Sequence, residues 1–186
     1  MGQYFRAINI DTKEIVSPYD YENGAKLAEH SWIGNRYLGA VECMLTPNGK
    51  WYRKRLVWSG DYADDGKFVP DGYDKSETLY SIACEHFAKL KPRKFRLPKE
   101  YRYIVNYSKD EYIDRSILPN SNGWRVNPLS ILTCDGNGRG GGDYHCRNDI
   151  DAKYVGSWAG DEIGIEIERP SSEFNEIRPD FFEDMS

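Results

Sequence analysis

A glycine-rich loop in the last third of the chain carries the residue types best suited to chemistry. It runs from residue 136 to 146 as GNGRGGGDYHC, and five of its first seven residues are glycine. Glycines are entropically costly to order, so such a loop makes sense where backbone amides must approach a ligand closely. Amides of this kind, together with an arginine, can hold a phosphate group. The candidate ligand-binding residues are therefore Asn137, Arg139, Asp143 and His145, together with Trp158.

Other chemistries fit the sequence less well. The loop matches neither a Walker A loop nor a dinucleotide fingerprint, and a merely flexible or tightly turned loop is the alternative interpretation. Cys134, His145 and Cys146 do not have the spacing typical of zinc ligands, so we expect no metal and no cofactor. Glu166 and Glu168 share one face of a predicted strand, a pattern more typical of a solvated face than of acid–base catalysis. No catalytic residue is assigned.

Two similar hairpins frame this loop. Residues 4–16 and 101–113 align without a gap and share a tyrosine, an asparagine and a glutamate at matching positions. A Gly-x-Trp sequence follows each hairpin, at residues 49–51 and 156–158, and an aliphatic residue comes five positions after each tryptophan. The order of hairpin, Gly-x-Trp and strand therefore occurs twice. This repetition predicts two diverged copies of one half-domain.

The fold class that we predict is α+β, with pseudo-twofold symmetry between two halves that each form a hairpin, a crossover and a returning strand. One amphipathic helix over Glu77–Leu90, with Asp74 as its cap, is expected to bridge the copies. A ligand or partner is expected in the cleft between the halves. The predicted organisation is a single domain over residues 1–170, with repeats at about 4–62 and 101–168, a bridge at 63–100 and an acidic tail at 171–186.

The two copies differ in length. Trp51 follows Asn9 by 42 residues, whereas Trp158 follows Asn106 by 52 residues. We expect the extra residues to lie at 135–150, where they would replace the helix region of the first copy. The glycine-rich loop is then the part that the copies do not share.

The start of the chain resembles a family of small proteins that open MGQYY and continue into an N-x-x-x-K-E hairpin. The residues that carry the resemblance are MGQY at 1–4, Asn9, Lys13-Glu14, GAKL at 24–27, Gly49-x-Trp51 and GDY at 60–62. At residues 52–55 the chain departs from that family, because YRKR stands where a small-residue turn is expected; the second copy keeps such a turn, as WAGD at 158–161. The resemblance covers mostly the first copy and implies no activity, ligand or catalytic residue.

Charge is distributed unevenly along the chain. The net charge is −5, yet residues 89–102, which we name the basic strip, carry seven basic residues against one glutamate. Residues 171–186 carry a net charge of −4. Phe95 and Tyr101 interrupt the basic strip, a pattern that fits nucleic acid, a solvated linker or a docking site for the acidic tail. The overall acidic balance argues against a dedicated nucleic-acid binder.

These features favour a binding role. Aromatic residues make up 14% of the chain, and such residues carry much of the energy of protein interfaces. We interpret the chain as a non-enzymatic binding protein, an inhibitor or immunity-type partner of another bacterial or phage protein. The alternative is a small-ligand site on residues 135–146 that binds or hydrolyses a phosphate-bearing molecule. Without a run of about 18 apolar residues or a secretory signal, we expect a soluble cytoplasmic protein with no membrane partner.

Overall fold

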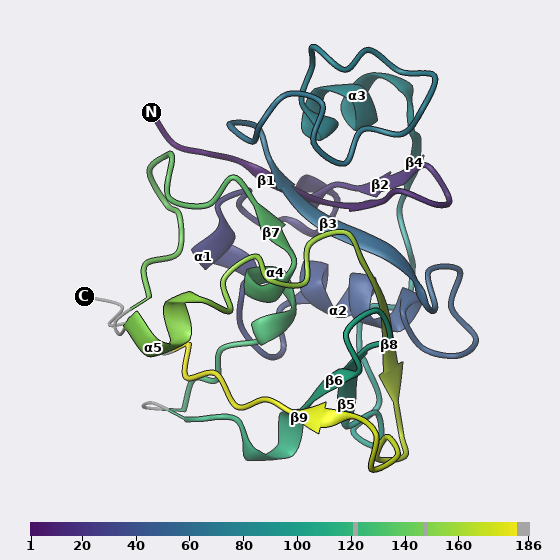
Figure 1. Ribbon diagram of the computed structural model, residues 1–186, viewed down its shortest axis with the longest axis vertical. Coiled ribbons are helices and arrows are strands. Elements are labelled where there is room, and N and C mark those ends of the chain that lie inside the picture. Colours follow the sequence, from purple (N-terminus) through teal and green to yellow (C-terminus); the bar gives the residue numbers. More distant parts are fainter. Residues whose placement is uncertain (121–122, 147–148, 182–186) are drawn as a thin grey trace.

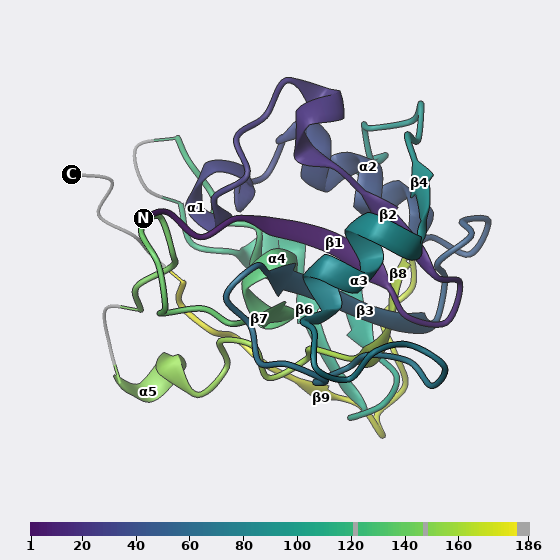
Figure 2. The same cartoon turned by 90° about the horizontal axis from the view of Figure 1, so that it is seen from above.

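In the computed structural model, residues 1–120, 123–146 and 149–181 are described, and they form a mixed α/β fold with one nine-stranded sheet and five short α-helices (Figures 1 and 2). The strands are β1 (Phe5–Asn9), β2 (Glu14–Val16), β3 (Lys54–Gly60), β4 (Ala88–Leu90), β5 (Tyr103–Asn106), β6 (Glu111–Asp114), β7 (Cys134–Asp135), β8 (Asp161–Glu166) and β9 (Asn175–Glu176). The α-helices are α1 (Leu27–His30), α2 (Arg36–Met44), α3 (Leu79–His86), α4 (Pro128–Leu132) and α5 (Asp149–Ala152). Two 3₁₀ turns are η1 (Pro18–Tyr21) and η2 (Arg115–Ile117).

The sheet is continuous from one half of the chain to the other. Its strand order is β4-β2-β1-β3-β8-β5-β6-β9, and β7 pairs with β3 off this path. β3 and β8 join the halves at the centre by antiparallel pairing, with Arg55 opposite Glu162. The outer strands β4 and β9 run parallel to β2 and β6. The two halves therefore share one backbone hydrogen-bond network.

The two hairpins use the same turn chemistry. The side-chain oxygen of Asn9 accepts hydrogen bonds from two backbone amides of its turn, at 3.1 and 3.2 Å. The side-chain oxygen of Asn106 accepts two such bonds, both at 2.9 Å. Asn9 lies opposite Leu56 in the sheet, and Asn106 lies opposite Ile163. Each asparagine closes its turn because its amide replaces a backbone acceptor.

Both faces of the sheet are covered. On one face, α2 and α4 pack over a core that contains the fully buried Trp51, Trp58 and Trp158. On the other face, α3 lies over β1 and β2, as Figures 1 and 2 show, and packs on Ile8 and Ile15. Because side chains alternate across a strand, strands buried on both faces need apolar residues at successive positions.

The bridging helix is shorter than the sequence predicts. α3 begins after Thr78, whose side chain caps the amide of Ser81, so the predicted cap at Asp74 is wrong. The helix ends at His86, and the next residues form β4 instead of a last helical turn. The edge of β2 offers free backbone groups, and Ala88 donates its amide to the carbonyl of Lys13 at 3.0 Å. Pairing with this edge outweighs the helical periodicity of the sequence.

We expected the glycine-rich segment to take the place of a helix in the second half, and this expectation is wrong. The second half keeps a helix, α4, capped by Asn127 with Pro128 in its first turn, and the loop follows it. Proline is favoured at this position because the first helical amides need no intrahelical acceptor. The extra residues therefore lie between the helix and the Gly-x-Trp turn.

The described part of the C-terminal tail packs against the second half. β9 pairs with β6, and Ile177 and Phe181 are buried in the main core. Up to residue 181, the backbone hydrogen bonds that join the tail to the rest of the chain go to the β6 hairpin, at Asp110 and Tyr112, and none goes to the basic strip. Among the helices of the described residues, none is long and apolar enough to cross a membrane.

Candidate functional site

The glycine-rich loop is folded around its own aspartate. Oδ2 of Asp143 accepts hydrogen bonds from the backbone amides of Gly138, Arg139 and Gly140 at 2.6, 2.8 and 3.0 Å. Asp143 is only 3% exposed. These three amides form the kind of nest that could bind an anion, and the carboxylate already occupies it. A phosphate would have to displace this buried carboxylate.

The other predicted loop residues make local contacts. Asn137 forms two hydrogen bonds of 2.8 Å with the backbone of Tyr144, one from its side-chain amide and one to its side-chain oxygen. Arg139 forms a two-pronged ion pair with Asp64 at 2.7 and 3.0 Å and also donates to the carbonyl of Tyr62. His145 is exposed at the end of the loop. The structure therefore brings Asn137, Arg139 and Asp143 together in the folded loop, and Arg139 links the loop to residues 62–64.

Trp158 lies apart from these loop residues. It is fully buried in the main core, and its indole N–H donates to Glu111 at 2.7 Å. Its backbone amide donates to the carbonyl of Leu132. The polar partners of Trp158 are thus residues of the hairpin and of α4, and its role in ligand binding stays a prediction.

A buried glutamine explains one of the loop glycines. Gln3 is fully buried beside the loop, and a Cβ atom added to Gly140 would lie 2.5 Å from the Cβ of Gln3. Any larger residue would push the loop away from the N-terminal strand. Close packing against residue 3, as well as flexibility, thus accounts for glycine at residue 140.

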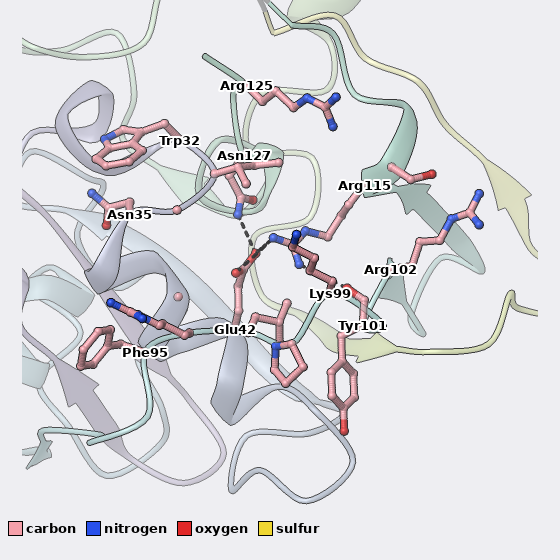
Figure 3. Close-up of a pocket in the computed structure, with 17 residues that line it drawn as sticks. Trp32, Asn35, Glu42, Phe95, Lys99, Tyr101, Arg102, Arg115, Arg125 and Asn127 are labelled. Carbon is pink, nitrogen blue, oxygen red and sulfur yellow. Dashed lines mark hydrogen bonds and ion pairs between the residues drawn. The ribbon is translucent and has the colours of Figure 1, made fainter. Parts of the chain in front are cut away.

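A second site, which we name the junction pocket, lies where α2, the basic strip and the second half meet (Figure 3). Its volume is about 620 Å³, within the range of small-ligand sites in proteins. Five basic side chains and one acidic side chain line it, namely Arg96, Lys99, Arg102, Arg115, Arg125 and Glu42. The expectation that a ligand or partner binds in a cleft between the halves stays a prediction.

A buried carboxylate organises the pocket wall. Glu42, on α2, is 3% exposed and lies 3.1 Å from the guanidinium of Arg115. It also accepts a hydrogen bond of 2.6 Å from the side-chain amide of Asn127, as the dashed lines in Figure 3 show. Arg115 donates in addition to the carbonyl of Tyr101. Glu42 thereby joins α2 to two segments of the second half and holds Arg115 in place.

A second ion pair lies at the rim. Arg102 binds Asp114 through two hydrogen bonds of 2.8 and 2.7 Å. The guanidinium of Arg102 outweighs the effect of burial and lowers the pKa of Asp114 to about 2. The same contact raises the pKa of Arg102. This pair is therefore fully charged at neutral pH and adds little net charge to the pocket.

The basic strip lies directly on α2. A Cβ atom at Gly39 would lie 2.2 Å from the carbonyl oxygen of Phe95, so glycine lets the two backbones meet. The strip separates the junction pocket from a second hollow of about 710 Å³, which we name the outer hollow. Arg93, Lys94 and Lys50 are among the residues that line the outer hollow. The strip is thus a ridge with a depression on each side.

Sequence reasoning identified the basic strip but missed its partners. Trp32, Arg115 and Arg125 are far from the strip along the chain, and no local pattern connects them. One signal was available in Glu42, an acidic residue within the apolar spacing of the helix at residues 36–45. Buried acids need a partner, so such a residue indicates a contact with a distant cation or amide.

The structure describes all four cysteines, which are Cys43, Cys84, Cys134 and Cys146. All four are free thiols, and burial raises the pKa of Cys134, whose Sγ donates to the carbonyl of Ile131. No group of three or more His, Cys, Asp or Glu residues that could hold a metal occurs within residues 1–120, 123–146 and 149–181. Comparison of the chain with protein families, with curated proteins and with solved structures finds no match.

Proposed function

We propose that this protein is a non-enzymatic binding protein, of inhibitor or immunity type, whose partner is another bacterial or phage protein with an acidic surface. The observation that carries the proposal is a row of exposed cations on the basic strip. None of these cations has an acidic partner among the described residues. They are Lys91, Arg93, Lys94, Arg96 and Lys99. Unpaired charges of one sign steer and orient an oppositely charged partner.

The neighbourhood of the strip supports this reading. Several cations elsewhere are held by acids, as in the pairs Arg55–Asp11 at 2.7 Å and Lys67–Asp135 at 2.7 Å. The outer hollow beside the strip gives a partner's side chains a place to enter. Phe95 and Tyr101 add aromatic surface between the cations. Aromatic anchors among charged residues are typical of protein interfaces.

The competing proposal places a phosphate-bearing ligand, or its hydrolysis, on residues 135–146. The contacts of Asp143 weaken it, because the loop amides that would bind phosphate already donate to this carboxylate. Arg139 is likewise engaged by Asp64. A panel of nucleotides and sugar phosphates tests it: a thermal shift that Arg139→Ala abolishes would favour the loop over the strip.

Affinity capture from a native lysate tests the partner proposal. The bait is the wild-type protein or the variant Arg93→Glu/Lys94→Glu, and Lys153→Glu is the control because Lys153 is equally exposed but far along the chain. We expect one protein to bind wild type and the control in stoichiometric amount, and to be lost with the double variant or in high salt. The purified partner should then bind with the same ranking.

Two outcomes would contradict the partner proposal. One is capture that the double charge reversal leaves unchanged, which would place the interface elsewhere. The other is capture that nuclease treatment abolishes, which would mean that nucleic acid is what the strip binds. Four free thiols suit a reducing compartment, so we also propose a cytoplasmic location; cell fractionation checks it.

We further propose that residues 4–62 and 101–168 are diverged copies related by a pseudo-twofold axis. The register supports this: Asn9 lies opposite Leu56, and Asn106 lies opposite Ile163. These pairs occupy matching positions relative to the hairpins and the Gly-x-Trp sequences. Each outer strand also pairs in parallel with the second strand of its hairpin.

The central strand pair supports the same axis. Arg55 and Glu162 each lie four residues after the tryptophan of a Gly-x-Trp sequence, and they lie opposite each other. A twofold axis between two copies requires such equivalent positions to meet. An experimental structure tests the proposal: residues 4–62 should superpose on 101–168 by a rotation near 180°, and a clearly different rotation would contradict it.

A further inference from the structure

Different kinds of side chain line the two sides of the junction pocket. Contact with an acidic protein surface would require the cations alone. In Figure 3, Trp32, Asn35 and Phe95 lie along one side, while Arg115 and Arg125 lie across from them. One side thus offers aromatic and amide groups, with the guanidinium of Arg96 6.0 Å from the centroid of the Phe95 ring, and the other side offers the guanidinium groups of Arg115 and Arg125. A ligand that fits this arrangement has a flat apolar part and an anionic part.

The cations of the pocket are not all available. Arg102 is neutralised by Asp114, and Arg115 is neutralised by Glu42. The remaining three have no acidic partner among the described residues, and they are Arg96, Lys99 and Arg125. Three unpaired positive charges around one pocket suit a phosphate group, which accepts charge-assisted hydrogen bonds from several donors.

The aromatic side has a fixed platform. The indole N–H of Trp32 donates to the carbonyl of Glu29 at 3.0 Å, and its ring meets that of Trp124 edge to face at 5.2 Å between centroids. These contacts hold the Trp32 ring in one orientation. The ring of Phe95, by contrast, already has the guanidinium of Arg36 at 4.6 Å from its centroid. Trp32 is therefore the better surface for a ligand ring to stack on.

We propose that the junction pocket binds a free nucleotide, with its base stacked on Trp32 and its phosphate between Arg125 and Lys99. The base accounts for the aromatic side, which inorganic phosphate or a sugar phosphate would leave unused. The lining of this site includes neither the amide nest of the glycine-rich loop nor Arg93 and Lys94, which line the outer hollow.

Titration calorimetry tests the proposal with AMP, ATP, adenosine and ribose 5-phosphate. We expect ATP to bind more tightly than AMP, because it carries more charge toward three unpaired cations. Adenosine and ribose 5-phosphate should each bind at least about tenfold more weakly than AMP, since each lacks one of the two recognised parts. AMP should also quench tryptophan fluorescence.

Variants locate the binding. Arg125→Ala should weaken AMP binding about tenfold, because one charge-assisted contact is lost. Lys99→Ala should do the same, which keeps the proposal testable if Arg125→Ala does not fold. Lys94→Ala is the matched control, since Lys94 lines the outer hollow and not the junction pocket; it should bind AMP as wild type does.

Several results would overturn the nucleotide proposal. These are no binding of AMP or ATP at millimolar concentration, equal binding of ribose 5-phosphate and AMP, or unchanged AMP binding in folded Arg125→Ala and Lys99→Ala. A single-stranded oligonucleotide that binds more tightly than ATP would also overturn it, because the site would then be part of a longer groove. The partner proposal is tested by capture with variants of Arg93 and Lys94, whereas the nucleotide proposal is tested by calorimetry with variants of Arg125 and Lys99. Failure of one proposal can therefore be distinguished from failure of the other.

Discussion

The buried indole of Trp51 donates its N–H to Oε2 of Glu14 at 2.8 Å. The other carboxylate oxygen of Glu14 accepts a hydrogen bond from Lys50. Burial acts to raise the pKa of Glu14, but the hydrogen bonds from Lys50 and Trp51 outweigh it and lower the pKa. The carboxylate is therefore charged at neutral pH, and it links the first hairpin to the Gly-x-Trp turn. Trp158 and Glu111 form the same contact in the second half.

Removal of this carboxylate should destabilise the fold. Glu14→Ala leaves the buried indole N–H of Trp51 without an acceptor, which should lower the free energy of unfolding by about 2 kcal/mol. Because the pKa of Glu14 is lowered on folding, its contribution is present above the ordinary pKa of glutamate and is lost as pH falls through the folded value. Urea denaturation at pH 7 measures the effect. Glu22→Ala, at a side chain that is 90% exposed, is the control and should change little; equal effects of the two would contradict the prediction.

His30 should make stability depend on pH near neutrality. It is fully buried, and burial lowers its pKa to about 3. Its Nε2 accepts the indole N–H of Trp58 at 2.8 Å, so the ring must stay neutral. The unfolded chain binds a proton near pH 6.5 and the folded chain does not, so stability rises with pH between about 3 and 6.5.

The histidine effect is measurable between pH 7 and pH 5, where carboxylates stay ionised. The free energy of unfolding should fall by about 2 kcal/mol over this interval in the wild type. His30→Gln keeps an acceptor for Trp58 but does not titrate, so its stability should change much less with pH. Guanidinium denaturation at both pH values checks this, and a variant with the same pH slope as the wild type would show that another group is responsible.

Local patterns were sufficient for the elements whose partners are close in sequence. The hairpin at residues 4–16 follows from alternation around a turn, and α2 follows from apolar residues spaced by three and four positions with Pro47 beyond. The end of the bridging helix could not be predicted in this way. Residues 88–90 pair with β2, which precedes them by more than 70 residues, and helical periodicity contains no information about that edge.

The sites illustrate the same limit. The glycine-rich loop was recognisable from composition, but the sequence does not say which carboxylate accepts hydrogen bonds from its backbone amides; in the structure Asp143 does so. The junction pocket combines Trp32, Lys99 and Arg125, which are brought together by an antiparallel bridge between Trp32 and Val126 and by the strip's path over α2. Counting charges along the sequence located the strip, because a run of basic residues can be recognised without the fold.

Two loop variants should show how much stability comes from the buried Asp143 and how much from the exposed ion pair between Arg139 and Asp64. Asp143→Ala removes the acceptor of three backbone amides in a residue that is 3% exposed, so it should destabilise the protein by about 2–4 kcal/mol. Arg139→Ala breaks an ion pair with the half-exposed Asp64 and should destabilise the protein much less, because exposed ion pairs contribute little to stability. Thermal denaturation followed by circular dichroism ranks them, and a larger effect of Arg139→Ala would show that the loop depends on its surface contact.

Gly39→Ala should loosen the basic strip, because its new Cβ would lie 2.2 Å from the carbonyl oxygen of Phe95. Alanine favours a helix by about 1 kcal/mol relative to glycine, whereas forcing apart two packed backbones costs about 1–3 kcal/mol. The clash involves backbone, which cannot rotate away as a side chain can, so the net effect should be destabilising. The strip carries several lysines and arginines, so limited trypsin digestion reports its release directly. Gly39→Ala should be cleaved within residues 91–99 faster than wild type, while Lys153→Ala, away from the strip, should be cleaved there at the wild-type rate; unchanged cleavage in Gly39→Ala would mean that α2 does not hold the strip in place.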